Sequence, residues 1–310
     1  MKVAIIGRTR MLLETAQLLL KNGHVISFVW SAVAEKYYDI KEDDFKQFAA
    51  QNNIPFYCTA KINDTDSISL IRDYGCEIAV SVNFPGIISE PVINLFAYGI
   101  LNAHAGDLPR YRGNACINWA ILNDEPEVGL SVHQMAPELD SGPVLLKKFY
   151  KLTETTYVTD VHKWMEQQIP PMFLAAIEGL EAKIIIPVPQ PQDNKLVLRT
   201  YPRRPEDGRI LWNNSAQSIM KVIRANSRPF EGAFTYLENM TQVIIWKADI
   251  FKPDFHFCAV AGQVCLKIGC DPVIACDNAM IRIIDATDEN GASADEVKGK
   301  ILSSLRNRLS

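Results

Sequence analysis

Short apolar runs alternate with amphipathic helical patterns along the first half of the chain. The apolar runs, which predict strands, occupy residues 2–7, 25–30, 55–58, 77–83 and 99–105. The helical patterns lie between them, at residues 10–22, 42–52, 65–74 and 89–96. Parallel strands joined by crossover helices produce this alternation, because each connection must return across a face of the sheet. The sequence therefore predicts an α/β fold with a Rossmann-like, mostly parallel sheet and helices on both faces.

The pattern continues to about residue 186 and then changes. A helical pattern at 114–123 and strand patterns at 128–135 and 142–150 precede a long helical pattern at 157–182. Pro170 and Pro171 are expected to interrupt that helix, because proline lacks the backbone N–H that a helix interior needs. Residues 187–204 are rich in proline and polar side chains, which is typical of a linker.

Beyond the linker, a helical pattern at 216–226 is followed by several short apolar runs. These runs lie at 233–238, 242–250, 262–268, 272–277 and 279–285. Short strands separated by Gly, Asp and Asn predict a small β-barrel-like (OB-like) domain. We therefore expect three parts: an N-terminal domain over 1–186, a linker over 187–204 and a smaller C-terminal domain over 205–310.

Composition narrows the classes of protein to which the chain can belong. Its 310 residues are 48% hydrophobic and 22% charged, with a net charge of −4 from 32 basic and 36 acidic residues. This balance argues against a nucleic-acid partner. The chain has no apolar run of about 18 residues, as a membrane span would need. The apolar run at its start is too short for a signal peptide. The seven cysteines contain no CxxC pair, which predicts reduced thiols, no metal and a cytoplasmic location.

The first strand–turn–helix, IIGRTRMLLETAQ, contains Gly7 but not the glycine pattern of dinucleotide-binding proteins. NAD is therefore not an expected cofactor. Arg8 and Arg10 lie at this turn, where backbone N–H groups and guanidinium groups can hold a phosphate. The alternative is that both arginines are simply solvated.

A polar pair interrupts the apolar segment at residues 99–105. In a strand, Asn102 and His104 point to the same side. Burying two polar side chains on one face costs free energy unless they form hydrogen bonds. His133 and Asp140 follow in the next strand pattern and loop. Asn, His and Asp at consecutive sheet ends would supply a donor, a group that titrates near neutrality and an orienting carboxylate. No Ser or Cys lies in a nucleophile elbow, so we expect acid–base catalysis on a small molecule.

The segments that carry these residues resemble a known family. LNAHAGDLPRYRGNACINWAI resembles the N-x-H…LPxYRG segment of 10-formyltetrahydrofolate-dependent formyltransferases. VGLSVHQMAPELDSGPVL resembles the same family's G-x-[ST]-x-H…LD[ST]G-x-[IV]-L segment. Residues 203–237 resemble the second domain of methionyl-tRNA formyltransferases and sugar-nucleotide N-formyltransferases. The resemblance covers nearly the whole chain and implies that residues 1–186 form the catalytic domain.

The resemblance implies a role for each matching residue. The catalytic trio would be Asn102, His104 and Asp140, which stabilise the negative oxygen of a tetrahedral intermediate and move the amine's proton. Contacts to the co-substrate 10-formyltetrahydrofolate would come from Phe84, Gly86, Ile87, Ile88, Leu139, Ser141 and Gly142. Independently of the resemblance, we expect contacts to the formyl acceptor from two loops, through Arg8, Arg10, Gly106, Arg110, Arg112 and Asn114.

Two features favour a nucleotide-linked amino sugar as the acceptor. The region after the second strand is acidic at Glu42, Asp43 and Asp44, where a tRNA would meet like charge. Ala105-Gly106-Asp107 also looks closer to the sugar-nucleotide enzymes. We therefore expect a cytoplasmic enzyme that serves O-antigen, lipopolysaccharide or other surface-glycan synthesis, and the resemblance implies a homodimer. The alternatives are a methionyl-tRNA formyltransferase and a non-catalytic binding protein that retains the fold.

Overall fold

The computed structural model describes residues 1–35 and 38–310, which form two compact units. The first unit contains Met1–Cys116, Glu127–Lys151 and His162–Tyr201. The second contains Ile117–Pro126, Leu152–Val161 and Pro202–Ser310. The second unit thus includes two short segments from the middle of the chain besides the C-terminal region.

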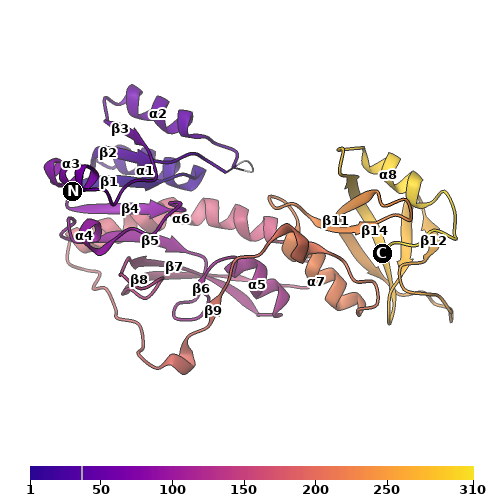
Figure 1. The fold of residues 1–310 in the computed structure, drawn as a ribbon. Coiled ribbons are helices and arrows are strands. Elements are labelled where there is room, and N and C mark those ends of the chain that lie inside the picture. Colours follow the sequence, from indigo (N-terminus) through magenta and orange to yellow (C-terminus); the bar gives the residue numbers. More distant parts are fainter. Residues whose placement is uncertain (36–37) are drawn as a thin grey trace. The chain divides into compact units, whose positions relative to one another are not determined.

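A seven-stranded sheet is the centre of the first unit (Figure 1). Its strands are β1 (Lys2–Gly7), β2 (Val25–Ser31), β3 (Phe56–Cys58), β4 (Ile78–Val82), β5 (Ile100–His104), β7 (Glu127–Gln134) and β8 (Val144–Lys151), in the order β3-β2-β1-β4-β5-β7-β8. The pairs among β1 to β5 are parallel, whereas β7 pairs antiparallel with both β5 and β8. This arrangement confirms the predicted mostly parallel α/β fold.

Helices follow the strands as the sequence pattern predicts. They are α1 (Arg10–Lys21), α2 (Glu42–Gln51), α3 (Thr65–Tyr74), α4 (Glu90–Ile93) and α6 (Val158–Glu181). Ala4 and Ile6 of β1 pack in one core with Ile71 of α3 and Val92 of α4. The residue between them, Ile5, points to the opposite face and is also fully buried. Both faces of the central strand are therefore covered.

Helix α6 corrects the expected interruption at Pro170 and Pro171. The helix runs through both prolines over its 24 residues. Ile169, Met172 and Phe173 on either side of the prolines are buried. Packing of this apolar face therefore outweighs the backbone hydrogen bonds that the two prolines cannot make.

The proline-rich segment after α6 stays with the first unit as far as Tyr201. It contains a short 3₁₀ helix (Asn194–Leu196) and strand β9 (Arg199–Thr200), which pairs in parallel with β6 (Arg112–Gly113). Val188 also forms an antiparallel bridge with Val144 at the start of β8. Most of the residues expected to link two domains therefore pack against β6 and the start of β8 in the first unit.

A five-stranded antiparallel sheet forms the core of the second unit. The strands are β10 (Ala233–Tyr236), β11 (Gln242–Phe251), β12 (Val264–Ile268), β13 (Asp271–Ala275) and β14 (Met280–Asp288), in the order β10-β11-β14-β13-β12. The accompanying helices are α5 (Cys116–Leu122), a 3₁₀ helix (Pro205–Gly208), α7 (Ala216–Asn226) and α8 (Ala294–Ile301). Ile219 and Ile223 of α7 share a core with Val297 of α8. The expected smaller β domain is thereby confirmed, and α8 is an element that the sequence pattern did not indicate.

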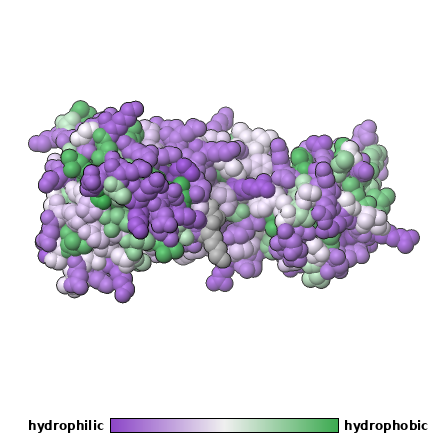
Figure 2. Space-filling view, turned by 90° about the horizontal axis from the view of Figure 1, so that it is seen from above, coloured by the Kyte–Doolittle hydropathy of each residue, from purple (hydrophilic) through white to green (hydrophobic). Residues whose placement is uncertain are grey.

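The protein surface is mainly hydrophilic on the face shown in Figure 2, with apolar residues scattered over it. Single exposed apolar residues are ordinary on protein surfaces. Within the described part of the chain, no helix has both the length and the apolar character needed to cross a membrane.

Candidate functional site

The polar pair of β5 faces a histidine on the neighbouring strand. Asn102 lies directly opposite His133 in the antiparallel β5–β7 ladder, so both side chains share one face of the sheet. Asn102 Nδ2 is 3.2 Å from His133 Nε2, and His133 Nδ1 is 2.8 Å from the carbonyl oxygen of Gln134. Nδ1 of His133 therefore carries the proton, and its Nε2 accepts a hydrogen bond from Asn102.

Asp140 approaches this face from the β7–β8 loop. Its Oδ1 lies 3.7 Å from His133 Nε2 and its Oδ2 lies 3.6 Å from His104 Nδ1. The sequence pattern placed the trio at consecutive sheet ends, which is wrong for Asp140. Strand β7 runs antiparallel to β5 and therefore ends where β5 begins. The loop after β7 must double back, and it brings the carboxylate over the face that carries Asn102 and His104.

His104 is buried at the end of β5, with both ring nitrogens near protein groups. Its Nε2 lies 2.5 Å from the carbonyl oxygen of Tyr111 and 3.6 Å from the thiol of Cys116. A Cβ at Gly106 would lie only 2.8 Å from His104 Nε2. Glycine at position 106 therefore lets the chain turn closely around the imidazole.

The two histidines have opposite pKa shifts. Burial lowers the pKa of His104, but the hydrogen bond with Cys116, the charge of Asp140 and the Tyr111 carbonyl outweigh burial and raise it to about 9. Burial lowers the pKa of His133 to about 4, and the nearby charge of His104 acts in the same direction. At neutral pH the site thus holds one cationic and one neutral imidazole beside a carboxylate.

This difference in protonation can be measured directly. We expect long-range ¹H–¹⁵N NMR spectra at pH 7 to show His104 as imidazolium and His133 as the neutral Nδ1–H tautomer. Asp140→Asn should lower the pKa of His104, because the carboxylate charge is one of the causes that raise it. His162 of α6 provides the reference, since burial alone lowers its pKa to about 4. A neutral His104 at pH 7 would contradict this assignment.

The loops around His104 contain residues in the left-handed backbone region. Tyr111, Ala115 and Asp140 have φ angles of 60°, 53° and 52°. Such conformations cost non-glycine residues about 1–3 kcal/mol each and persist only where other contacts fix them. Here the carbonyl of Tyr111 accepts the His104 bond, and the Asp140 carboxylate accepts a bond of 2.9 Å from Gly113 N. The strain is therefore located in the residues that hold the imidazole and the carboxylate.

Two further residues support the trio, and sequence analysis did not single out either. Cys116 donates from its thiol to the Tyr111 carbonyl at 3.1 Å and lies 3.3 Å from Thr200 Oγ1. Gln190, in the proline-rich segment, hydrogen-bonds to the backbone of Asp140 and to the side chain of Arg112. Neither position has a distinctive sequence pattern, because both contacts join residues brought together only by the fold.

The loop predicted to contact folate is held in one shape by Asn63. The side-chain amide of Asn63 donates to the carbonyl of Ile87 at 2.8 Å and accepts from Ser89 N at 2.9 Å. Ile87 is 80% exposed, whereas the side chain of Ile88 belongs to the core. The side chain of Ile88 is therefore not available to a ligand. Phe84 is partly buried, and no atom lies within 4 Å of a Cβ built on Gly86.

The remaining residues predicted for folate lie in the β7–β8 loop beside Asp140. Leu139 is 47% exposed. Ser141 donates from its hydroxyl to the carbonyl of Glu138, which tightens the turn. A Cβ at Gly142 would lie 1.9 Å from the carbonyl oxygen of Gln134. Glycine is therefore required at position 142 for the loop to return to β8.

The arginines predicted to hold phosphate already have partners. Arg8 forms an ion pair of 2.9 Å with Glu35 and donates to two backbone carbonyls. Arg10 forms an ion pair with Asp39. A phosphate at this turn would have to compete with both carboxylates.

The other residues predicted for the acceptor lie on the loop after β5. Arg110 is exposed, with its guanidinium 5.7 Å from the centre of the Tyr111 ring. Arg112 donates to Gln190, and the backbone of Asn114 donates to the carbonyl of Thr200. Gly106 is buried against His104, as described above. Of the two arginines in this loop, Arg110 is more exposed to solvent than Arg112.

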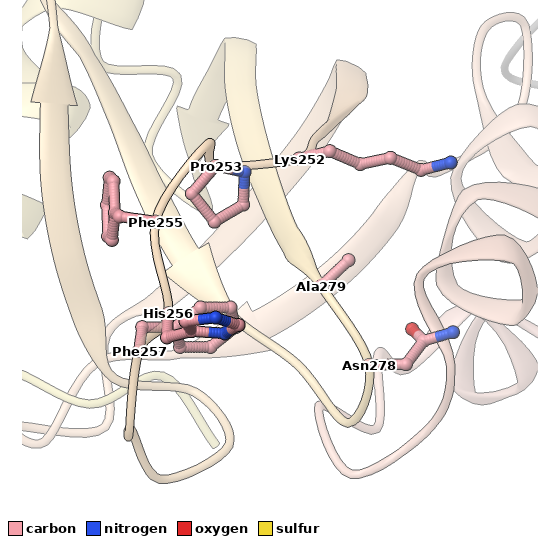
Figure 3. A pocket seen from close by; sticks show the side chains of 7 residues that line it. All are labelled: Lys252, Pro253, Phe255, His256, Phe257, Asn278 and Ala279. Carbon is pink, nitrogen blue, oxygen red and sulfur yellow. The ribbon is translucent and has the colours of Figure 1, made fainter.

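A separate open depression of about 290 Å³ lies in the second unit, by the β11–β12 connection (Figure 3). It is lined by Lys252, Pro253, Phe255, His256, Phe257, Asn278 and Ala279. None of the residues predicted for catalysis, folate or the acceptor lies in it. Among the described residues of both units, no three His, Cys, Asp or Glu side chains are grouped to hold a metal ion.

Comparison with solved structures shows a shared fold. WlaRD, described as a sugar 3N-formyl transferase and solved with dTDP and 5-N-formyl-THF, matches with a TM-score of 0.65 and 19% identity. The match covers 94% of this chain and 99% of WlaRD. HypX from Aquifex aeolicus, in complex with tetrahydrofolic acid, matches 98% of this chain with a TM-score of 0.67 and 15% identity. This chain spans 47% of HypX.

Comparison with sequences shows the family. The methionyl-tRNA formyltransferase of Fusobacterium nucleatum is 28% identical over 309 residues, covering 97% of this chain and 98% of that protein. The sequence model of the Formyl transferase family matches residues 1–177, and that of the Formyl transferase C-terminal domain matches residues 203–297. The chain belongs to the formyl transferase family.

Proposed function

We propose that the protein transfers a formyl group from 10-formyltetrahydrofolate to the primary amine of a nucleotide-linked amino sugar. The observation that carries the proposal is the convergence of Asn102, His104 and Asp140 on one face of the sheet. These residues supply hydrogen-bond donors and a proton acceptor around one point, as acyl transfer to an amine requires.

Asn102 and His104 would stabilise the tetrahedral intermediate. Attack of the amine on the formyl carbon places a negative charge on the formyl oxygen. One hydrogen of Asn102 Nδ2 is directed at His133, which leaves the second for this oxygen. Protonated His104 provides a positive charge in a buried setting, where electrostatic stabilisation is stronger than in water.

Asp140 is the group best placed to take the amine's proton. With a pKa of about 9, His104 is protonated at pH 7 and has no lone pair to offer. The Asp140 carboxylate lies between the two histidines and is held by Gly113 N. In this position the carboxylate would accept the proton as the amine attacks the formyl carbon.

Folate would lie between the β7–β8 loop and the loop of Ile87 and Ile88, to which Asn63 is hydrogen-bonded. The exposed side chains of Ile87 and Leu139 offer apolar contact to the pterin, and the backbone beside them offers hydrogen bonds. The presence of tetrahydrofolic acid in the HypX structure and of 5-N-formyl-THF in the WlaRD structure supports folate as the co-substrate.

A nucleotide-linked sugar is favoured as the acceptor by the charge around the first turn. Glu35 and Asp39 neutralise Arg8 and Arg10. Helix α2 begins with three further acidic residues, Glu42, Asp43 and Asp44. RNA affinity depends on phosphate contacts, whereas a pyrophosphate needs only one or two arginines. We propose exposed Arg110 as its anchor. Arg8 or Arg10 is the alternative, and either would have to exchange its carboxylate partner for the phosphate.

Methionyl-tRNA is the second candidate acceptor, favoured by the 28% identity to the Fusobacterium enzyme over nearly the whole chain. One competition experiment separates the two. The purified protein with 10-formyltetrahydrofolate is offered dTDP-, UDP- and GDP-linked amino sugars and charged initiator tRNA, at ~150 mM salt. We expect an N-formyl sugar product by mass spectrometry and kcat/KM values above that for tRNA. A higher kcat/KM for tRNA than for every sugar would overturn the sugar assignment.

A further inference from the structure

Gln190 is a buried glutamine within a proline-rich stretch, PVPQPQ. It is only 6% exposed, although the residues on both sides of it are exposed. A buried side-chain amide is costly unless all its hydrogen-bonding groups are satisfied. Its partners therefore show what this segment does in the fold.

The amide of Gln190 joins the two loops that carry the candidate chemistry. Its Nε2 donates to the carbonyl oxygens of Asp140 at 2.8 Å and Gly142 at 2.7 Å. Its Oε1 accepts from Arg112 Nη2 at 2.6 Å and from Arg112 Nε at 3.1 Å. Both donors and both lone pairs of the amide are thus used, one side for each loop.

These contacts act on the backbone that sets the position of the carboxylate. Asp140 has a φ of 52°, so its conformation needs external support. The residue after Arg112 is Gly113, whose N–H donates to Asp140 Oδ2. Gln190 therefore binds the residue that carries the carboxylate and the residue next to the carboxylate's donor. The Val188–Val144 bridge anchors the segment that contains Gln190.

We propose that Gln190 is a positioning residue, which keeps the Asp140 carboxylate in register with His104 by fastening the β7–β8 loop to Arg112. The proposal rests on the proposed function only in that Asp140 takes part in the reaction. It assigns a role to a segment that the sequence pattern indicated as a linker.

The test uses the full chain with Gln190→Ala and Gln190→Glu. Glutamate keeps the acceptor for Arg112 but cannot donate to the carbonyls of Asp140 and Gly142. We expect kcat to fall by about 10-fold in both variants, because small misplacements of a reacting group are costly. KM for folate should rise as well, because the loop that Gln190 fastens carries Gly142, one of the proposed folate contacts. Lys195→Ala, an exposed neighbour in the same segment, is the control and should keep wild-type kcat.

The decisive readout is the NMR titration of His104, which needs no substrate. Loss of Gln190 should let Asp140 move away, so the pKa of His104 should fall towards its ordinary value in both variants. An unchanged His104 titration would overturn the proposal, whatever the effect on kcat or on the unfolding midpoint. If Gln190→Ala does not fold, Gln190→Glu is judged by the same criterion. Since the acceptor is absent from this measurement, an error in the proposed function cannot mimic its failure.

Discussion

Replacement of His104 with alanine, or of Asp140 with asparagine, is expected to lower kcat for formyl transfer by about 100-fold or more. The first change removes the buried cation that would face the developing oxyanion. The second removes the proton acceptor and the carboxylate charge, which is one of the causes that raise the pKa of His104. The measurement is the rate of tetrahydrofolate formation under saturating acceptor, with the unfolding midpoint recorded for each variant.

Controls separate loss of chemistry from loss of fold. His104→Gln retains a donor near the Tyr111 carbonyl and fills most of the same space, so it should fold well and remain impaired. His256→Ala changes a histidine of the second unit, outside the proposed catalytic residues, and should keep full activity. Near-normal turnover in folded His104→Ala or Asp140→Asn would remove these residues from the mechanism.

Gly113→Ala is expected to lower the free energy of unfolding by about 3 kcal/mol and kcat by about 100-fold. A Cβ at this position would lie 2.1 Å from the backbone carbonyl oxygen of Thr200, and the φ of 110° disfavours any side chain. Relief of that clash must separate β6 from β9. The Gly113 N–H would then move away from the Asp140 carboxylate that it binds.

Gly299→Ala is the matched control for this substitution. Gly299 lies in α8, no atom is within 4 Å of a Cβ built there, and its φ is not positive. Alanine in a helix interior should stabilise the protein by about 0.5–1 kcal/mol. Urea unfolding measures the free energy of unfolding of both variants. Equal stability of Gly113→Ala and wild type would show that β6 and β9 can separate without cost.

The parts of the fold that repeat a local pattern could be predicted from sequence. The apolar run KVAIIG gives β1 (Lys2–Gly7) because each of its buried residues must be covered on one face or the other. Alternation along β5 likewise places Asn102 and His104 on one side, which is where the structure has them. Residue spacing alone therefore indicated two members of the candidate site.

What the sequence pattern missed depends on distant parts of the chain. Pro170 and Pro171 were expected to break a helix that tertiary packing keeps intact. The antiparallel direction of β7 decides how Asp140 reaches the histidines, and no single segment encodes that direction. Gln190 meets Asp140 across 50 residues of chain. Such contacts have no period or motif, so they become visible only when the loops are folded.

The two hydrogen bonds of the Asn63 side-chain amide affect how a ligand would bind to the loop of Ile87 and Ile88. These bonds, to the Ile87 carbonyl and from Ser89 N, lie on either side of Ile88, so the backbone of this stretch is restrained. The conformational entropy of this loop is lost when the chain folds and not when a ligand arrives. A rigid, flat molecule docking here would meet a ready template, and its dwell time would be governed by shape complementarity rather than by loop ordering.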